Sequence, residues 1–245
     1  MRILGVIPSR YASTRLPGKP LADIGGKSMI RRVYEQAKQA PSLYRVVVAT
    51  DHLDIRQEVE SFGGEVMMTK DTHPSGTDRC AEVVQQLGEQ VDYVINIQGD
   101  EPFIHPDEIE ALATLLKEKQ PDLGTLIKPI VHTEVLADPS KIKVVVNTNG
   151  EALYFSRQAI PYLRSAPMGE WLEHHTYYRH LGMYAYQAQV LQAIAKLPPS
   201  SLEQAESLEQ LRWMEHGYRI HVALSPHDSF SIDTPEDLKR ARKQV

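Results

Sequence analysis

The first half of the chain alternates short apolar runs with segments in which apolar residues recur every three or four positions. The apolar runs predict strands, and they cover residues 3–7, 45–49, 65–68 and 93–97. Unbroken β-branched residues, as in the second run, are typical of a strand that is buried on both faces. The periodic segments predict helices, and they cover residues 28–39, 51–62, 78–87 and 106–119. Strand followed by helix, four times over, predicts a Rossmann-like α/β fold with a mostly parallel sheet and helices on both faces.

The second half of the chain is predicted to be a mixed lobe. Strand-like runs cover residues 123–130, 142–146, 152–155, 181–186 and 218–224, and the turn composition of 147–150 predicts a hairpin there. Helices are predicted at 235–243 and at 201–216, where Ser201 and Gln204 match a capping box. Because no linker separates the halves, we expect residues 1–245 to form a single α/β domain. Its second half, 123–245, is expected to close over a cleft beside 1–122.

Composition and charge narrow the class of protein. The chain has 245 residues, of which 42% are hydrophobic and 24% charged, as in ordinary globular proteins. A net charge of −5 argues against nucleic-acid binding, which requires a positive surface. The one cysteine, Cys80, allows no internal disulfide and fits a reducing compartment. No apolar run approaches the length of a membrane span, so we expect a soluble cytoplasmic protein without membrane contact.

The loop after the first predicted strand contains the first residues that suggest a ligand. Ligands of such sheets bind at the carboxyl ends of the strands, and this loop holds the cations Arg10, Arg15 and Lys19. Arginine and lysine side chains suit the oxygens of a polyphosphate, although an ordinary cationic surface loop is an equally good interpretation of this stretch alone. A P-loop is excluded, because Gly26-Lys27 would require glycine at position 21, which is leucine.

Two carboxylates are candidate metal ligands. Asp100 follows the fourth strand, and a carboxylate facing a triphosphate suits Mg²⁺. It could instead cap the next helix, but Asp107 and Glu108 already suit that role, so the metal is favoured. Asp233 precedes a helix that starts at Pro235, and by itself this pattern favours an N-cap over a metal ligand.

Other polar segments admit two interpretations each. Asp51 is a candidate N-cap for the second helix. Residues 72–79 either contact a base or simply begin a helix, with Ser75 or Thr77 as its cap. Several polar side chains of the second half together suit a polyhydroxylated acid, although each alone is more simply a surface group: Arg157, Arg164, Arg179, His180, Tyr184, Glu209 and Gln210.

Taken together, the motifs closely resemble one family. The blocks at 7–21, 75–79, 96–102, 152–157, 179–184, 208–212 and 232–238 are similar, in the same order, to those of 3-deoxy-manno-octulosonate (Kdo) cytidylyltransferases, which have the nucleotide-diphospho-sugar transferase fold. The resemblance runs from about residue 3 to 242. It implies that CTP and Kdo give CMP-Kdo and pyrophosphate with Mg²⁺, for lipopolysaccharide biosynthesis. The anomeric hydroxyl would attack the α-phosphorus in line.

The resemblance also implies roles for individual residues, and it reverses the interpretation of Asp233. It places Arg10, Arg15 and Lys19 on the triphosphate, Ser75, Gly76 and Arg79 at the nucleotide, Asp100 and Asp233 on magnesium, and Gln98, Arg164, His180, Tyr184, Glu209 and Gln210 at the sugar. Arg10, Lys19, Asp100 and Asp233 would be the catalytic set. The family implies a homodimer formed by the second half.

The segment before Asp233 departs from the family pattern. Residues 225–231 lack the glycine-rich turn of many members. An 8-amino analogue of Kdo or another sugar acid is therefore an alternative substrate, and a non-catalytic nucleotide-binding protein is a further alternative.

Overall fold

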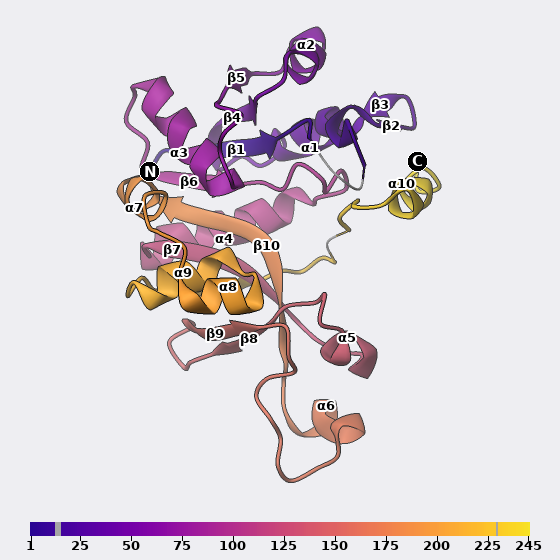
Figure 1. Ribbon diagram of the computed structural model, residues 1–245, viewed down its shortest axis with the longest axis vertical. Coiled ribbons are helices and arrows are strands. Elements are labelled where there is room, and N and C mark those ends of the chain that lie inside the picture. Colours follow the sequence, from indigo (N-terminus) through magenta and orange to yellow (C-terminus); the bar gives the residue numbers. More distant parts are fainter. Residues whose placement is uncertain (13–15, 229) are drawn as a thin grey trace.

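A computed structural model of the chain describes residues 1–12, 16–228 and 230–245. Within these ranges a nine-stranded sheet runs through the molecule in the order β11-β7-β10-β6-β1-β4-β5, and β8 and β9 join it beside β10 (Figure 1). Its strands are β1 (Ile3–Ser9), β4 (Leu43–Thr50), β5 (Val66–Met68), β6 (Tyr93–Asn96), β7 (Leu123–Pro129), β8 (Lys143–Val146), β9 (Ala152–Ser156), β10 (Tyr178–Gln187) and β11 (Ile220–Leu224). A separate two-stranded ribbon pairs β2 (Asp23–Ile24) with β3 (Lys27–Ser28).

The sheet is parallel except around β10 and in the antiparallel β8–β9 hairpin. Strands β6, β1, β4 and β5 pair in parallel, as do β7 and β11, whereas β10 lies antiparallel between β6 and β7. The register of β10 against β7 shifts between Leu181 and Tyr184. Because of this irregularity the strand bends at the carboxyl end of β6, where the polar loops gather.

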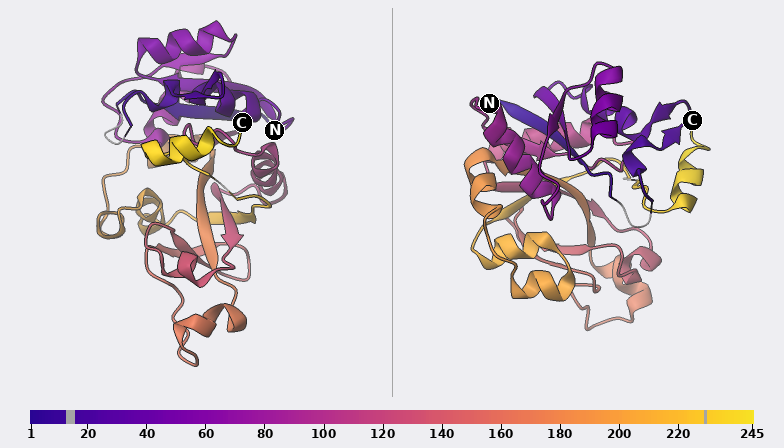
Figure 2. Two further views of the ribbon diagram at one scale, coloured as in Figure 1. Left: turned by 90° about the vertical axis from the view of Figure 1, so that its right-hand side faces the viewer. Right: turned by 45° about the horizontal axis from the view of Figure 1, so that its top comes forward.

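Helices cover both faces of the sheet, as predicted. One apolar cluster packs α1, α2 and α4 on one face, and a second packs α3, α7 and α9 on the other (Figure 2). The helices are α1 (Met29–Ala37), α2 (Leu53–Ser61), α3 (Gly76–Leu87), α4 (Pro106–Lys119), α5 (Thr133–Ala137), α6 (Trp171–His174), α7 (Ala188–Ile194), α8 (Ser201–Glu206), α9 (Glu209–Glu215) and α10 (Pro235–Ala241), with short 3₁₀ turns at η1 (Lys19–Leu21) and η2 (Met168–Glu170). Cys80 is fully buried in the second cluster, as its position on the helical stripe predicts. No helix in the described ranges is long and apolar enough to cross a membrane.

The predicted helix over 201–216 is wrong, because the structure breaks it in two. Ser207 has a left-handed backbone (φ 52°) that ends α8, and Leu208 then runs in extended conformation before α9 begins. The predicted capping pair is also one residue late, since the Glu203 carboxylate accepts from the Ser200 N–H. The break turns α9 so that its first residue, Glu209, meets the sheet.

The prediction of Asp51 as an N-cap is also wrong. His52 caps α2, because its Nδ1 accepts from the Asp54 N–H at 3.2 Å. Asp51 instead pairs with Arg79 on α3. Its carboxylate is therefore used for a tertiary contact that no local pattern indicates.

Candidate active site

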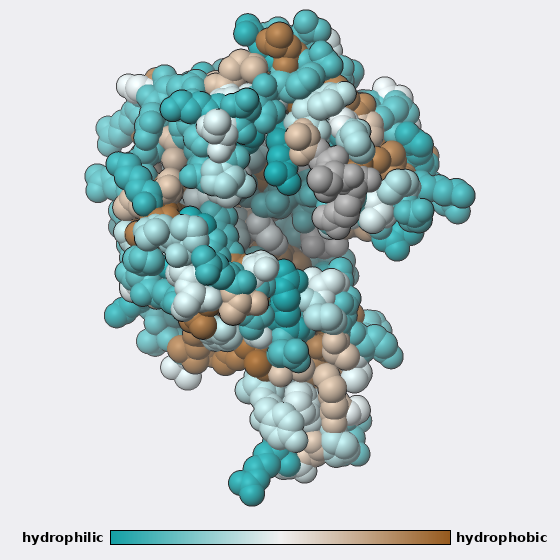
Figure 3. All heavy atoms as spheres, in the orientation of Figure 1, coloured by the Kyte–Doolittle hydropathy of each residue, from teal (hydrophilic) through white to brown (hydrophobic). Residues whose placement is uncertain are grey.

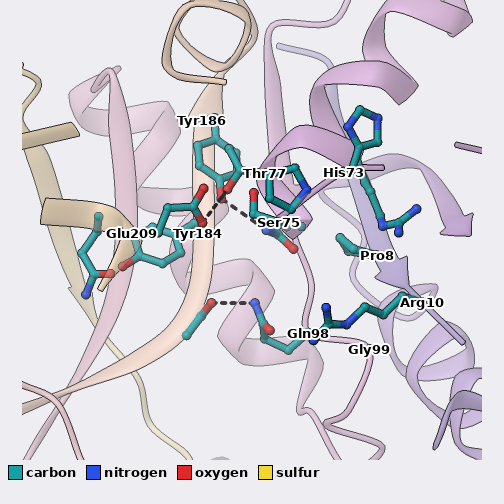
Figure 4. A pocket seen from close by; sticks show the side chains of 16 residues that line it. Pro8, Arg10, His73, Ser75, Thr77, Gln98, Gly99, Tyr184, Tyr186 and Glu209 are labelled. Carbon is teal, nitrogen blue, oxygen red and sulfur yellow. Dashed lines mark hydrogen bonds between the residues drawn. The ribbon is translucent and has the colours of Figure 1, made fainter. Parts of the chain in front are cut away.

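A cavity of about 360 Å³ opens at the carboxyl ends of β1 and β6, beside the bend in β10 (Figure 4). The surface of the molecule is hollowed there (Figure 3). In Figure 4, Tyr184, Tyr186 and Glu209 stand on one side, and Pro8, Arg10 and His73 on the other. The cavity is lined by Pro8, Arg10, His73, Pro74, Ser75, Gly76, Thr77, Arg79, Asn96, Gln98, Gly99, Gly182, Tyr184, Tyr186, Glu209 and Gln210.

Gly99 allows the loops after β1 and β6 to pack against each other. A Cβ atom at this position would lie 2.7 Å from the Pro8 carbonyl oxygen and 2.9 Å from Ser9 Oγ. Any larger residue would push the two loops apart. Gly99 thus holds Gln98 and Asp100 next to the loop that carries the cations.

Lys19 lies between the two candidate metal ligands. Its ammonium nitrogen is 2.7 Å from Asp100 Oδ2 and 3.2 Å from Asp233 Oδ1. Gly18 places it there, because a positive φ of 66° turns the chain into η1 directly before Lys19. The two aspartates are 133 positions apart in the sequence, yet they share one cation in the structure.

Neither aspartate is a helix cap. Thr234 caps α10 by accepting from the Asp237 N–H, and Asp237 accepts from the Thr234 N–H in return. His105 caps α4, and Glu108 completes that capping box. The structure therefore excludes the capping alternatives for Asp100 and Asp233.

The segment that leads to Asp233 is held at two described residues, Asp228 and Ile232. The Ile232 N–H donates to the Asp100 carbonyl at 2.9 Å, so the two aspartates are joined through the backbone. Further back, Asp228 pairs with Lys128 and Arg179. These contacts position the described residues of the segment on either side of residue 229.

The carboxylates fit a hard divalent cation. Two carboxylates around one positive charge, next in the chain to the lining residues Gln98 and Gly99, are the donor set that Mg²⁺ shares with substrate phosphates. Burial and the neighbouring Asp100 charge raise the pKa of Glu101 to about 8. At neutral pH Glu101 therefore keeps its proton and adds no charge to the pair.

A second group of possible ligands lies outside the cavity. Atoms of His105, Asp107 and His227 lie within 4.8 Å of one another. The two imidazole rings are stacked, with centroids 3.8 Å apart and planes at 23°. Stacked rings direct their in-plane lone pairs side by side rather than toward a common point, so this cluster serves as a contact between α4 and the segment before Asp233.

Arg79 is buried under the cavity and paired. Its guanidinium donates to Asp51 Oδ2 at 2.5 Å, to Thr69 Oγ1 at 2.7 Å and to the Lys70 carbonyl at 3.1 Å. Arg79 also lines the cavity, and the three hydrogen-bond acceptors just named are protein groups. The expected contact of Arg79 with a nucleotide stays a prediction. Its hydrogen bonds within the protein indicate that it also stabilises the fold.

Replacing Arg79 with methionine should lower the free energy of unfolding by about 3–5 kcal/mol, because Asp51 would keep a buried, unpaired charge. Urea unfolding without ligand measures this. Arg45→Met is the matched control, because that half-exposed arginine pairs with Glu65 and Glu89 at the surface and its loss should cost about 1 kcal/mol or less. Equal losses in the two variants would contradict a structural role for Arg79.

The side of the cavity across from Arg10 contains buried polar groups without a hydrogen-bond partner among the described residues. Within the described residues, the buried Tyr184 hydroxyl and the buried Gln210 Nε2 have no hydrogen-bond partner. Gln98 Nε2 donates to the Gly182 carbonyl at 2.7 Å, which ties the loop after β6 to the bend of β10. Buried polar atoms without partners cost stability unless a ligand satisfies them. This end of the cavity is therefore suited to a hydroxylated molecule.

Comparisons with known proteins agree with this geometry. The sequence profile described as "Cytidylyltransferase" matches residues 4–220. The chain is 53% identical to the 3-deoxy-manno-octulosonate cytidylyltransferase of Parabacteroides distasonis, over 98% of this chain and 97% of that one. It is 54% identical to the enzyme of the same name from Cytophaga hutchinsonii, over 97% and 95% of the two chains. The chain belongs to the 3-deoxy-manno-octulosonate cytidylyltransferase family.

Solved structures extend the comparison. A CMP:2-keto-3-deoxy-manno-octonic acid synthetase complexed with CTP superposes with a TM-score of 0.92 at 44% identity, covering 100% of this chain and 98% of that one. A putative glucose-1-phosphate thymidylyltransferase from Bacillus anthracis has a TM-score of 0.68 at 17% identity, covering 99% and 94%, and shows the fold alone. Both confirm the nucleotidyltransferase-type α/β fold expected from the sequence.

Most of the residues that the cytidylyltransferase resemblance singled out come together. Arg10, Ser75, Gly76, Arg79, Gln98, Tyr184, Glu209 and Gln210 line the cavity, and Lys19, Asp100 and Asp233 form the adjacent cluster. His180 lies behind Tyr184, with ring centroids 5.1 Å apart, and burial lowers its pKa to about 3. Arg15 lies outside the described residues.

Arg164 does not join the cavity. It is an exposed residue between β9 and α6, and it is absent from the lining of the cavity. Within one chain, the structure therefore does not support its expected place at the sugar. Sequence reasoning did not assign three further lining residues, Thr77, Asn96 and Tyr186, to the cavity. Thr77 and Asn96 lie inside the blocks at 75–79 and 96–102, whereas Tyr186 lies two positions beyond the block at 179–184.

Proposed function

We propose that this cytidylyltransferase transfers CMP from CTP to Kdo, giving CMP-Kdo and pyrophosphate for lipopolysaccharide biosynthesis. One observation carries the proposal. Lys19, Asp100 and Asp233 form a charged cluster at the mouth of a cavity that has a cationic end and a hydroxyl-recognising end. The relatives' names and the CTP-complexed structure supply the nucleotide and the sugar acid.

The two ends of the cavity suit the two substrates. We place the nucleotide against Ser75, Gly76 and Arg10, because backbone donors at the start of α3 and a guanidinium suit a base and phosphates. The sugar acid lies opposite, against Tyr184 and Glu209. A hydroxyl of the sugar can then approach the α-phosphorus from the side away from pyrophosphate, as in-line displacement requires.

Catalysis in this arrangement is mainly positioning and charge stabilisation. Lys19 and Arg10 neutralise charge that develops on the phosphates, and Asp100 and Asp233 would hold Mg²⁺. When bound, Mg²⁺ screens the phosphate charge and makes the sugar hydroxyl a better nucleophile. No described side chain takes the position of a protein nucleophile, and the reaction needs none, since effective concentration supplies a large part of the rate.

The homodimer stays a prediction, and the surface supports it. Val131, Leu153, Tyr162 and Leu224 are exposed large hydrophobic residues of the second half, and apolar side chains gather over the β8–β9 hairpin in Figure 3. We assign Arg164 to this surface rather than to the cavity. Sedimentation of the purified chain tests the assignment. The cytoplasmic location also stays a prediction.

The test of function is pyrophosphate release with CTP and Mg²⁺, measured in parallel with Kdo, its 8-amino analogue and N-acetylneuraminate. We expect release with Kdo. Release with the amino analogue alone would keep the mechanism and shift the substrate, pointing to residues 225–231 as the specificity segment. No release with any acceptor would contradict the proposed function.

A further inference from the structure

One wall of the cavity holds a row of hydrogen-bonded polar groups that ends at Glu209, and three of them, Asn96, Tyr186 and Thr77, have no role in the proposed function. Asn96 Nδ2 donates to the Tyr186 hydroxyl at 3.2 Å, the Tyr186 hydroxyl lies 3.4 Å from Thr77 Oγ1, and Thr77 Oγ1 donates to Glu209 Oε2 at 3.2 Å. Asn96, Tyr186 and Thr77 are buried almost completely. Figure 4 shows Tyr186 and Thr77 close together and aimed at Glu209.

The two ends of the row set the direction of its bonds. The Asn96 amide nitrogen can only donate, so the Tyr186 oxygen accepts from it. Thr77 Oγ1 donates its one hydrogen to Glu209 Oε2, so Thr77 accepts from the Tyr186 hydroxyl. Donation therefore runs from Asn96 to Glu209 when the Glu209 carboxyl is ionised.

We propose that Asn96, Tyr186 and Thr77 are positioning residues that present Glu209 to the sugar acid as an ionised hydrogen-bond acceptor. The proposal rests on the proposed function, because it names how that site recognises its hydroxylated substrate. Oε2 of Glu209 accepts from Thr77, and the carboxylate has further lone pairs with which to accept from a sugar hydroxyl. Gln210 Nε2 and the Tyr184 hydroxyl, the buried groups without partners, complete the same wall of the cavity.

The hydrogen bond from Thr77 matters because the burial of Glu209 disfavours the charged form of its carboxyl group. Burial raises the pKa of Glu209, while the hydroxyls of Ser75 and Thr77 and the charge of Arg212 lower it. Its other ionisable neighbours are Asp78 and Cys80 on α3 and Tyr184 and Tyr186 on β10. Asp78 raises the pKa of Glu209 further. Loss of the Thr77 hydroxyl should therefore raise the pKa of Glu209. As the pH falls, the carboxylate should then be protonated at a higher pH than in the unsubstituted protein.

The matched pair Thr77→Val and Thr77→Ser tests this. Valine keeps the shape and removes the donor, whereas serine keeps the donor. In Thr77→Val we expect about a tenfold higher KM for Kdo, as loss of one hydrogen bond to a charged group implies, with KM for CTP changed less than about twofold. The midpoint of kcat/KM for Kdo against pH should move to higher pH. Thr77→Ser should restore both values, and Tyr186→Phe should show a smaller change in the same direction.

A direct titration separates this proposal from the proposed function. The Glu209 carboxyl carbon, assigned with Glu209→Gln, can be followed by NMR without any substrate in the unsubstituted protein and in both Thr77 variants. A higher titration midpoint in Thr77→Val than in Thr77→Ser supports the proposal even if Kdo proves not to be the substrate. Equal midpoints would overturn it, as would equal rises of KM for CTP and Kdo with no change in the pH profile. Thermal unfolding of each variant identifies any loss of fold, and Tyr186→Phe then serves in place of Thr77→Val.

Discussion

Replacing Asp100 with asparagine should lower kcat for pyrophosphate release by at least about a hundredfold, since even an indirect partner of a metal ligand is worth about 10–100-fold. The amide oxygen is a poorer ligand for Mg²⁺ and carries no charge. The fold should be kept, because the carboxylate is partly exposed and contacts only Lys19 among the described groups. The backbone carbonyl that receives the Ile232 N–H is unchanged.

The measurement is the rate of pyrophosphate release at increasing Mg²⁺ concentration. Asp122→Asn is the matched control, since it makes the same change in an exposed aspartate directly before β7, at the edge of the sheet away from the cavity. It should keep nearly full activity. Near-normal turnover of Asp100→Asn at saturating Mg²⁺ would remove Asp100 from the metal site.

Replacing Lys19 with methionine should have two opposite effects. It should lower kcat about 10²–10³-fold, because a positive charge that stabilises the phosphates in the transition state is lost. It should also strengthen the binding of Mg²⁺ to the free protein. In the structure the Lys19 ammonium occupies the space between Asp100 and Asp233, so that a divalent ion must displace it. Without Lys19 the two carboxylates repel each other more strongly, and the ion no longer competes with the ammonium for them.

Thermal unfolding with and without Mg²⁺ measures the second effect. The rise in Tm on adding Mg²⁺ should be larger for Lys19→Met than for the unsubstituted protein. Lys27→Met removes an exposed lysine that pairs with Glu35 and should leave both activity and the Mg²⁺ shift unchanged. A smaller shift in Lys19→Met would show that the ammonium does not stand in the cation position.

The segment before Asp233 gives a structural reason to compare Kdo with its 8-amino analogue as substrates. The names of the relatives indicate Kdo, and this segment is held by ion pairs and one backbone hydrogen bond. Asp228 is held by Lys128 and Arg179, and Ile232 by the Asp100 backbone. Because Asp233 follows directly, any movement of the segment alters the metal site and the sugar site together. Comparison of Kdo with its 8-amino analogue therefore probes this segment as well as the substrate.

The errors of the sequence-based predictions have a common cause. Asp51 stands where an N-cap should be, yet its partner is Arg79, which lies 28 positions away. The helix over 201–216 has an unbroken helical pattern, yet Ser207 adopts a left-handed backbone so that Glu209 can face Thr77. In both places a tertiary contact outweighed a local preference of about 1 kcal/mol.

The sequence by itself determined the order of strands and helices in the first half, the buried position of Cys80 and the presence of a cationic loop followed by acidic strand ends. These depend on hydrophobic periodicity and turn residues, which act over a few positions. Only the tertiary structure decided that Asp100 and Asp233 share Lys19, that Arg164 lies away from the cavity, and that Asn96, Tyr186 and Thr77 support Glu209. Such contacts join residues up to 214 positions apart. They depend on how the sheet packs against its helices, which no local pattern records.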